Sequence, residues 1–117
     1  MPFDFLLDYL PANIIVKPAI GMFYIYFDQK IVLILRKTGK NPQHNGIWIA
    51  TQRENHDSLK IEIPAITKFI LDEGIDTNWL LLSDSHDDFE SAATQLCELV
   101  SRNDKRIGKV TPNSRML

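Results

Sequence analysis

The sequence predicts an α+β domain in which an N-terminal and a C-terminal helix flank an antiparallel sheet of about five strands. Two neighbouring segments, 21–27 and 30–36, are rich in aromatic and β-branched residues and are joined by a two-residue turn, which is typical of a β-hairpin. Apolar residues also recur at helical spacing between Phe89 and Val100. The chain has 117 residues, of which 44% are hydrophobic, so it is long enough for one domain with its own core.

The first segment of the chain predicts a short helix. Its apolar residues recur at spacings of three and four, which places them on one helical face, and Pro11 ends the helix. The residues of this face are Phe3, Leu6, Leu7 and Leu10. The segment 13–18 follows as a connector, in which Pro18 favours an extended backbone.

The predicted hairpin carries apolar residues on both faces of both strands. A sheet with one solvent-exposed face alternates more regularly between apolar and polar residues. Either helices cover both faces, or a second copy of the chain covers one of them, and the second option predicts a homodimer. After a polar loop, Asn45 and Gly46 turn the chain into a third strand over 47–50, which completes a β-meander.

The next segment predicts a helix followed by a second pair of strands. Thr51 is expected to cap a helix from about residue 52 to 63, because threonine is a favourable N-cap residue and Pro64 stops the helix. Apolar segments at 66–71 and 78–82 predict two further strands, joined by a turn.

The C-terminal part predicts the longest helix. The sequence Ser85-His86-Asp87-Asp88 fits the capping-box pattern that precedes a helix, and the helix is expected to end near Asn103. We therefore assign residues 1–110 to a single α+β domain and residues 111–117 to a flexible tail.

The sequence predicts a cytoplasmic protein without membrane association. The N-terminus lacks the basic residues that precede the apolar run of a secretory signal. No apolar run approaches the roughly 20 residues of a membrane-spanning helix. Cys97 is the single cysteine, so an intramolecular disulfide is excluded.

Charge is unevenly distributed along the chain, whose net charge is −2. The segment 70–100 is acidic and contains no Lys or Arg, whereas the segment 102–117 is basic. One interpretation is a phosphate-binding surface, which would make the protein a weak nucleic-acid binder through Lys105, Arg106 and Lys109. The other is a solvated surface that neutralises acidic neighbours, and the net charge favours this one.

Motifs for catalysis or metal binding are weak. Asp84, His86, Asp87 and Asp88 offer metal-ligating groups, but carboxylates at a helix start are also expected from capping and the helix dipole. Cys97 has no adjacent basic residue and is expected to be a buried structural thiol. The sequence has no nucleophile elbow, phosphate-binding glycine loop or dinucleotide fingerprint. We therefore assign no catalytic residue, metal or cofactor.

A small-molecule pocket is one alternative function. Polar and aromatic residues meet near the loop 39–46, where Arg36, His44 and Trp48 are candidate ligand contacts. Trp48 and the strand tyrosines are also candidates for stacking on a base, although aromatic residues in strands more often belong to the core. In this alternative the protein is a ligand-binding protein or an enzyme.

A resemblance to known proteins begins at Gly21-Met22-Phe23, continues through the aromatic strand to Asp28-Gln29-Lys30, and ends in the apolar strand that follows. These residues resemble the N-terminal domain of the TfoX competence regulators and, more loosely, the small bacterial MmcQ/YjbR-like proteins. The resemblance implies a compact α+β domain, a role in regulating DNA uptake for TfoX, and DNA binding for the MmcQ/YjbR group. It implies no catalytic residue.

Together these observations favour a non-enzymatic binding or regulatory module. Its partner is a protein, a nucleic acid or a second copy of the chain. The alternatives are the small-molecule pocket near 39–46 and the nucleic-acid surface at the C-terminus.

Overall fold

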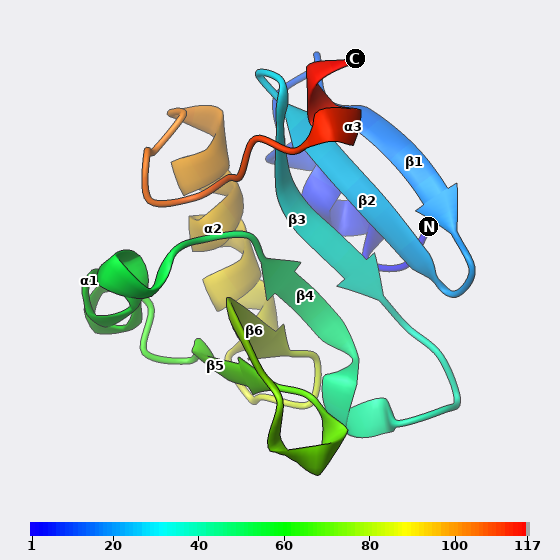
Figure 1. The fold of residues 1–117 in the computed structure, drawn as a ribbon, viewed down its shortest axis with the longest axis vertical. Coiled ribbons are helices and arrows are strands. Elements are labelled where there is room, and N and C mark those ends of the chain that lie inside the picture. The colour runs from blue at the N-terminus through cyan, green and yellow to red at the C-terminus, as the bar shows by residue number, and fades with distance from the viewer. Residues whose placement is uncertain (117) are drawn as a thin grey trace.

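The strands form one antiparallel sheet in the order β1-β2-β3-β4-β6-β5, and the computed structural model describes residues 1–116. The strands are β1 (Ile15–Ala19), β2 (Met22–Phe27), β3 (Lys30–Arg36), β4 (Gly46–Ile49), β5 (Thr67–Ile70) and β6 (Asp76–Ser83). Strands β1 to β4 form a meander, and the β5–β6 hairpin joins the sheet through β6 (Figure 1). The predicted α+β class and the meander-plus-hairpin arrangement are confirmed.

The helices are mostly short. They are the 3₁₀ helices η1 (Asp4–Asp8), η2 (Pro42–His44), η3 (Arg53–Asn55) and η4 (Asp72–Gly74), and the α-helices α1 (His56–Glu62), α2 (Phe89–Ser101) and α3 (Pro112–Arg115). In Figure 1, α2 and η1 lie behind the sheet, α1 lies at its side, and α3 lies in front of β2 and β3. Within residues 1–116, no helix has both the length and the hydrophobicity needed to cross a membrane.

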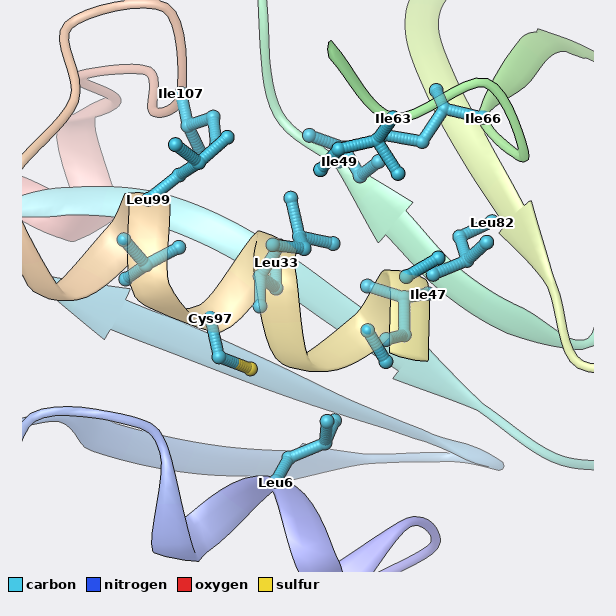
Figure 2. Close-up of a cluster of buried hydrophobic side chains, with 14 of the residues drawn as sticks. Leu6, Leu33, Ile47, Ile49, Ile63, Ile66, Leu82, Cys97, Leu99 and Ile107 are labelled. Carbon is cyan, nitrogen blue, oxygen red and sulfur yellow. The ribbon is translucent and has the colours of Figure 1, made fainter. Parts of the chain in front are cut away.

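The main core lies between the sheet and the pair α2 and η1. The predicted apolar stripe of α2 is buried throughout, which confirms its helical spacing. Figure 2 shows side chains of α2, η1 and the central strands meeting in one cluster, and Leu6, Leu33, Ile47, Leu82 and Cys97 in this cluster are all fully buried. This burial fixes α2 and η1 to one face of the sheet, and neither helix covers the other face.

The sheet has one strand more than predicted, because the segment assigned as a connector forms β1. Val16 and Lys17 pair with Ile25 and Tyr24 of β2, so this segment is extended by backbone pairing. Its burial pattern is almost entirely exposed, which is why its side chains gave no strand signal. Pro18 is tolerated because β1 is an edge strand.

The N-terminal helix is a 3₁₀ helix, and one residue of the predicted apolar face points outward. Leu6 and Leu10 are buried, but Leu7 is 49% exposed. Successive residues of a 3₁₀ helix are about 120° apart around its axis, so Leu7, which directly follows the buried Leu6, lies on a different face. The expected α-helical spacing is therefore wrong at Leu7.

Two predicted helix caps are wrong. The Thr51 hydroxyl donates a hydrogen bond to the carbonyl oxygen of Arg106 at 2.6 Å instead of capping the helix that follows. The segment Ser85-His86-Asp87-Asp88 is a turn, and α2 begins only at Phe89 without a side-chain cap. In this turn the Asp88 backbone N–H donates to Nδ1 of His86 at 3.0 Å. The hydroxyl of Ser85, the expected capping residue, instead contacts the hydroxyl of Ser83 at 2.9 Å.

The C-terminal segment packs against the sheet. Lys109 pairs with Ile31 through two backbone hydrogen bonds of 3.0 and 2.9 Å, which extends the sheet beside the first half of β3. Thr111 and Ser114 then form a capping box at the start of α3, and Ser114 is fully buried. The tail predicted as flexible therefore contains a short helix at 112–115, while Leu117 lies outside the described residues.

Candidate functional site

The face of the sheet opposite α2 and η1, here called the open face, is lined by aromatic and apolar residues. Tyr26, Ile31, Ile34 and Ala50 are buried on it, and Met22, Tyr24, Trp48 and Trp79 are only partly covered. Cross-strand pairing places side chains of several strands in one row across this face. From β1 to β5 the row consists of Lys17, Tyr24, Ile34, Trp48, Leu81 and Thr67.

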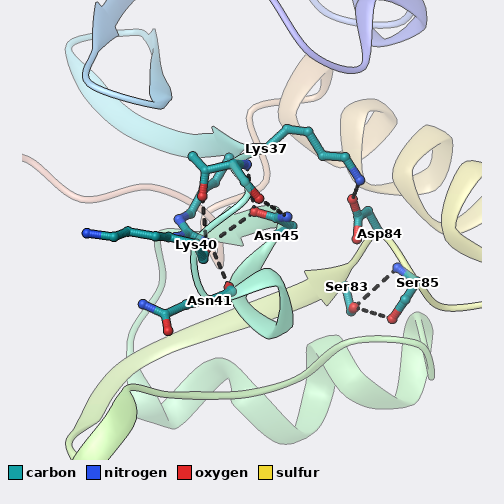
Figure 3. Close-up of polar contacts among 9 residues, drawn as sticks. Lys37, Lys40, Asn41, Asn45, Ser83, Asp84 and Ser85 are labelled. Carbon is teal, nitrogen blue, oxygen red and sulfur yellow. Dashed lines mark hydrogen bonds and ion pairs between the residues drawn. The ribbon is translucent and has the colours of Figure 1, made fainter.

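The loop between β3 and β4 is held by Arg36 and Asn45. The guanidinium of Arg36 donates to the carbonyl oxygens of Lys40 at 2.8 Å and Asn41 at 2.9 Å, and to Oδ1 of Asn45 at 3.0 Å. Asn45 also exchanges two hydrogen bonds with the backbone of Thr38. Figure 3 shows this network, in which Lys37 reaches away from the loop to pair with Asp84. The loop is therefore fixed in place.

A hollow of about 640 Å³, here called the central hollow, lies on the open face between this loop and the β1–β2 turn. It is lined by Ile20, Gly21, Met22, Arg36, Thr38, Gly39, Lys40 and Trp48. Two contacts hold the Trp48 ring in place. Its Nε1–H donates to the His44 carbonyl at 2.9 Å, and the ring packs on Phe69 with ring centroids 4.5 Å apart. The hollow therefore combines a fixed aromatic ring with two cationic side chains.

Two further hollows lie on the same face. The first, of about 480 Å³, lies between β1, β2 and α3, and we call it the β1 hollow. It includes Lys17, Tyr24 and Tyr26. The second, of about 560 Å³, lies beside the start of β6, and we call it the β6 hollow. It includes Arg53, Trp79 and Lys109. Each of these hollows again brings an aromatic ring together with a cation.

The cations of the open face differ in how they are neutralised. Arg53 lies 3.6 Å from a carboxylate oxygen of Asp76, so it is part of an ion pair. Within residues 1–116, Lys17, Arg36, Lys40 and Lys109 have no carboxylate within 4.0 Å. Within the described residues, these four positive charges are therefore not balanced by an adjacent carboxylate.

The structure brings together two of the three predicted ligand contacts. Arg36 and Trp48 line the central hollow, but His44 does not. The imidazole of His44 is buried against Phe69, and its Nε2 lies 3.3 Å from Asp72. His44 supports Trp48 from behind instead of facing the hollow.

The structure separates the three predicted nucleic-acid contacts. Arg106 is bound to Asp104, Glu62 and Ser58, with its shortest contacts to the two carboxylates at 2.7 Å. These contacts raise the pKa of Arg106 further and connect the C-terminal segment to α1. Lys105 is exposed and lines none of the hollows, whereas Lys109 lies in the β6 hollow.

Cys97 and His56, two side chains with groups that can react, are both buried in the fold. Cys97 is fully buried, and desolvation raises its pKa to about 12, so the thiol stays protonated at neutral pH. His56 is also buried, and its Nε2 donates to the Asn78 carbonyl at 2.8 Å. Within residues 1–116, no three His, Cys, Asp or Glu side chains come close enough to hold a metal ion.

The sequence analysis missed several residues of the open face. Met22, Ile20 and Lys40 line the central hollow. Lys17 lines the β1 hollow, and Trp79 lines the β6 hollow. Ile20 is fully exposed at the β1–β2 turn. The available signal was an isoleucine directly before Gly21 and the apolar strand that follows, but its neighbours in space come from other parts of the chain.

Comparisons with known proteins give no relative for this chain. No protein family, curated protein or solved structure matches it.

Proposed function

We propose that this protein is a non-enzymatic binding module whose central hollow takes an anionic ligand with an aromatic or apolar part. The observation that carries this proposal is the combination of Trp48, Arg36 and Lys40 around one hollow on a fixed loop. Trp48 offers a flat apolar surface, and the two cations attract negative charge.

The remaining chemistry supports binding instead of catalysis. The Cys97 thiol is buried and protonated, and the two buried histidines contact neighbouring side chains or backbone and support the fold. The resemblance of residues 21–35 to the TfoX and MmcQ/YjbR-like domains, which supply no catalytic residue, points the same way. A regulatory role and a cytoplasmic location remain part of this proposal.

Ligand titration with mononucleotides tests the proposal, because these carry both a phosphate and an aromatic base. Binding is measured by intrinsic tryptophan fluorescence and by thermal shift, with inorganic phosphate and uncharged indole as separate probes. We expect the nucleotide to bind more tightly than either probe alone, and Lys40→Glu and Trp48→Leu each to weaken it at least about tenfold.

Lys105→Glu is the matched control, because Lys105 is an exposed lysine that lines none of the hollows. It leaves nucleotide affinity unchanged if the central hollow is the site. Equal loss of affinity in Lys105→Glu and Lys40→Glu, or no binding of any probe, would contradict the proposal.

A further inference from the structure

We propose that the open face binds single-stranded nucleic acid, with successive bases on Tyr24, Trp48 and Trp79 and the backbone phosphates on the lysines and arginines beside them. This inference rests on the proposed function and extends it from one hollow to three. It names an unpaired polynucleotide as the ligand.

The first observation is that the same pair of chemical groups recurs in each hollow of the open face. The central hollow has Trp48 with Arg36 and Lys40, the β1 hollow has Tyr24 with Lys17, and the β6 hollow has Trp79 with Lys109. Proteins that bind single strands combine aromatic rings, which stack on bases, with cations that contact phosphates. A repeated pair fits a ligand that repeats the same two chemical groups along its length.

The second observation is the charge of the residues that line the hollows. The residues that line the three hollows include five Lys or Arg and no Asp or Glu, although acidic residues outnumber basic ones in the chain by 15 to 13. The five cations are Lys17, Arg36, Lys40, Arg53 and Lys109. A hollow between α2 and the segment 63–65 on the helical side instead contains Asp88 and no cation. The open face is therefore the side that attracts a polyanion, in spite of the net charge of −2.

The third observation is the placement of the rings. Tyr24 and Trp48 both pair with Ile34, so they lie on either side of β3 and are roughly 10 Å apart at the strand spacing of a sheet. Trp79 is on β6 two residues from Leu81, the partner of Trp48, which places it about 8 Å from Trp48. A polynucleotide that crosses the strands meets the three rings in turn.

The partly covered rings favour a single strand over a duplex. Stacking on a protein ring needs a base whose flat face is free, and the faces of bases inside a duplex are already stacked on each other. The open face also presents a sheet, and within residues 1–116 it offers no long helix to enter a major groove.

Fluorescence anisotropy with labelled 12-nucleotide strands tests this inference. Single-stranded RNA, single-stranded DNA and a DNA duplex of mixed sequence are each titrated with the protein at 50 and 200 mM salt. We expect at least one of the two single strands, RNA or DNA, to bind at least about tenfold more tightly than the duplex. Tryptophan fluorescence is expected to be quenched on binding. Affinity is expected to fall with salt, since each lysine that contacts a phosphate adds about one unit to the slope of log K against log salt.

Charge reversals in the β1 hollow and the β6 hollow give the sharpest comparison. Lys17→Glu and Lys109→Glu each lie outside the central hollow and on exposed side chains, so the fold is expected to tolerate them. Each is expected to weaken single-strand binding at least about fivefold and to leave mononucleotide binding unchanged. Lys105→Glu is again the control and leaves both affinities unchanged.

The outcomes separate this inference from the proposed function. If mononucleotides bind and Lys17→Glu and Lys109→Glu leave strand affinity unchanged, the inference is wrong while the proposed function stands. If neither mononucleotides nor strands bind, both are wrong. Duplex binding as tight as single-strand binding also overturns the inference, and its loss in Lys105→Glu would favour the C-terminal surface predicted from the sequence.

Discussion

At the scale of single residues, Gly46 decides how the loop beside the central hollow meets the sheet. Its φ of +137° lies in a region that other residues rarely adopt, and a Cβ built on it would lie 2.1 Å from the carbonyl oxygen of Leu82. That oxygen belongs to the backbone of β6 and cannot move aside without breaking strand pairing. The close approach of β4 to β6 therefore requires glycine here.

We predict that Gly46→Ala lowers the free energy of unfolding by at least about 2 kcal/mol, because it introduces both backbone strain and a steric clash. Urea denaturation at neutral pH measures this change. Gly39→Ala in the same loop is the matched control, since nothing lies within 4 Å of its Cβ position. A loss below about 0.5 kcal/mol in Gly46→Ala would contradict the close packing described for this strand pair.

The side chain of Asn45 holds Arg36 and the loop between β3 and β4 in position without a ligand. Its side-chain amide bonds to Arg36 and to both backbone groups of Thr38. Its backbone carbonyl oxygen also accepts from the Asp84 backbone N–H. Asparagine is suited to this role because its side chain both donates and accepts. The positions of Arg36 and the loop are therefore set by the fold itself.

At the scale of elements, the turn that follows α2 is held by a charged pair between Asp104 and Arg106. The Arg106 guanidinium donates to both carboxylate oxygens of Asp104, at 2.9 and 2.7 Å. This contact with Arg106 is the main reason that the pKa of Asp104 lies below its ordinary value of 3.8. The ion pair holds the chain after α2 in the turn that leads to the sheet.

The lowered pKa of Asp104 predicts a pH-dependent stability difference. A carboxyl whose pKa is lower in the folded state stabilises the fold above its unfolded pKa, and this stabilisation is lost as the pH falls through the folded pKa. Asp104→Asn is expected to lower the free energy of unfolding by about 1–2 kcal/mol at pH 7. The difference from wild type is expected to shrink below about pH 4.

Urea denaturation between pH 2 and 7 measures this difference. Asp8→Asn is the control, because Asp8 is exposed and has no ion pair within residues 1–116. A stability difference for Asp104→Asn that stays constant down to pH 2 would show that the carboxylate charge does not contribute through Arg106.

At the scale of the whole molecule, the β2–β3 hairpin has apolar residues on both faces, and different elements cover each face. Helices α2 and η1 cover one face, and α3 with the segment around Lys109 covers part of the other. The uncovered part contains Met22 and Trp48, and Arg36 and Lys40 line the same hollow. The sequence-based argument for a homodimer therefore applies only to this smaller area.

We expect the protein to be a monomer of 13.5 kDa at physiological salt. A symmetric dimer through the open face would bring each cationic cluster close to its copy, and like charges in a desolvated interface are unfavourable. Light scattering from micromolar to millimolar concentration measures the mass. A mass near twice this value that drops in Trp48→Arg would establish the homodimer on the open face instead.

The sequence by itself determined the elements whose signals are local. The hairpin of β2 and β3 follows from two adjacent β-prone segments and a turn, and the buried stripe of α2 follows from its helical spacing. The sequence also predicted a pocket at the loop next to Trp48, because polar and aromatic residues are close in the sequence there, and a hollow lies beside this loop. These features depend on residues that are near each other along the chain.

Only the tertiary structure decided which residues share the open face and which charges remain available on it. β1 is a strand because it pairs with β2, and its exposed side chains carry no periodic signal. Arg106 pairs with Glu62, which lies 44 positions away, as well as with its neighbour Asp104. Lys17 and Lys109 come from distant parts of the chain to the same face. The physical reason is that the periodicity of a sequence depends only on whether each side chain is buried. Which residues a side chain contacts depends on strand order and on ion pairs between distant parts of the chain.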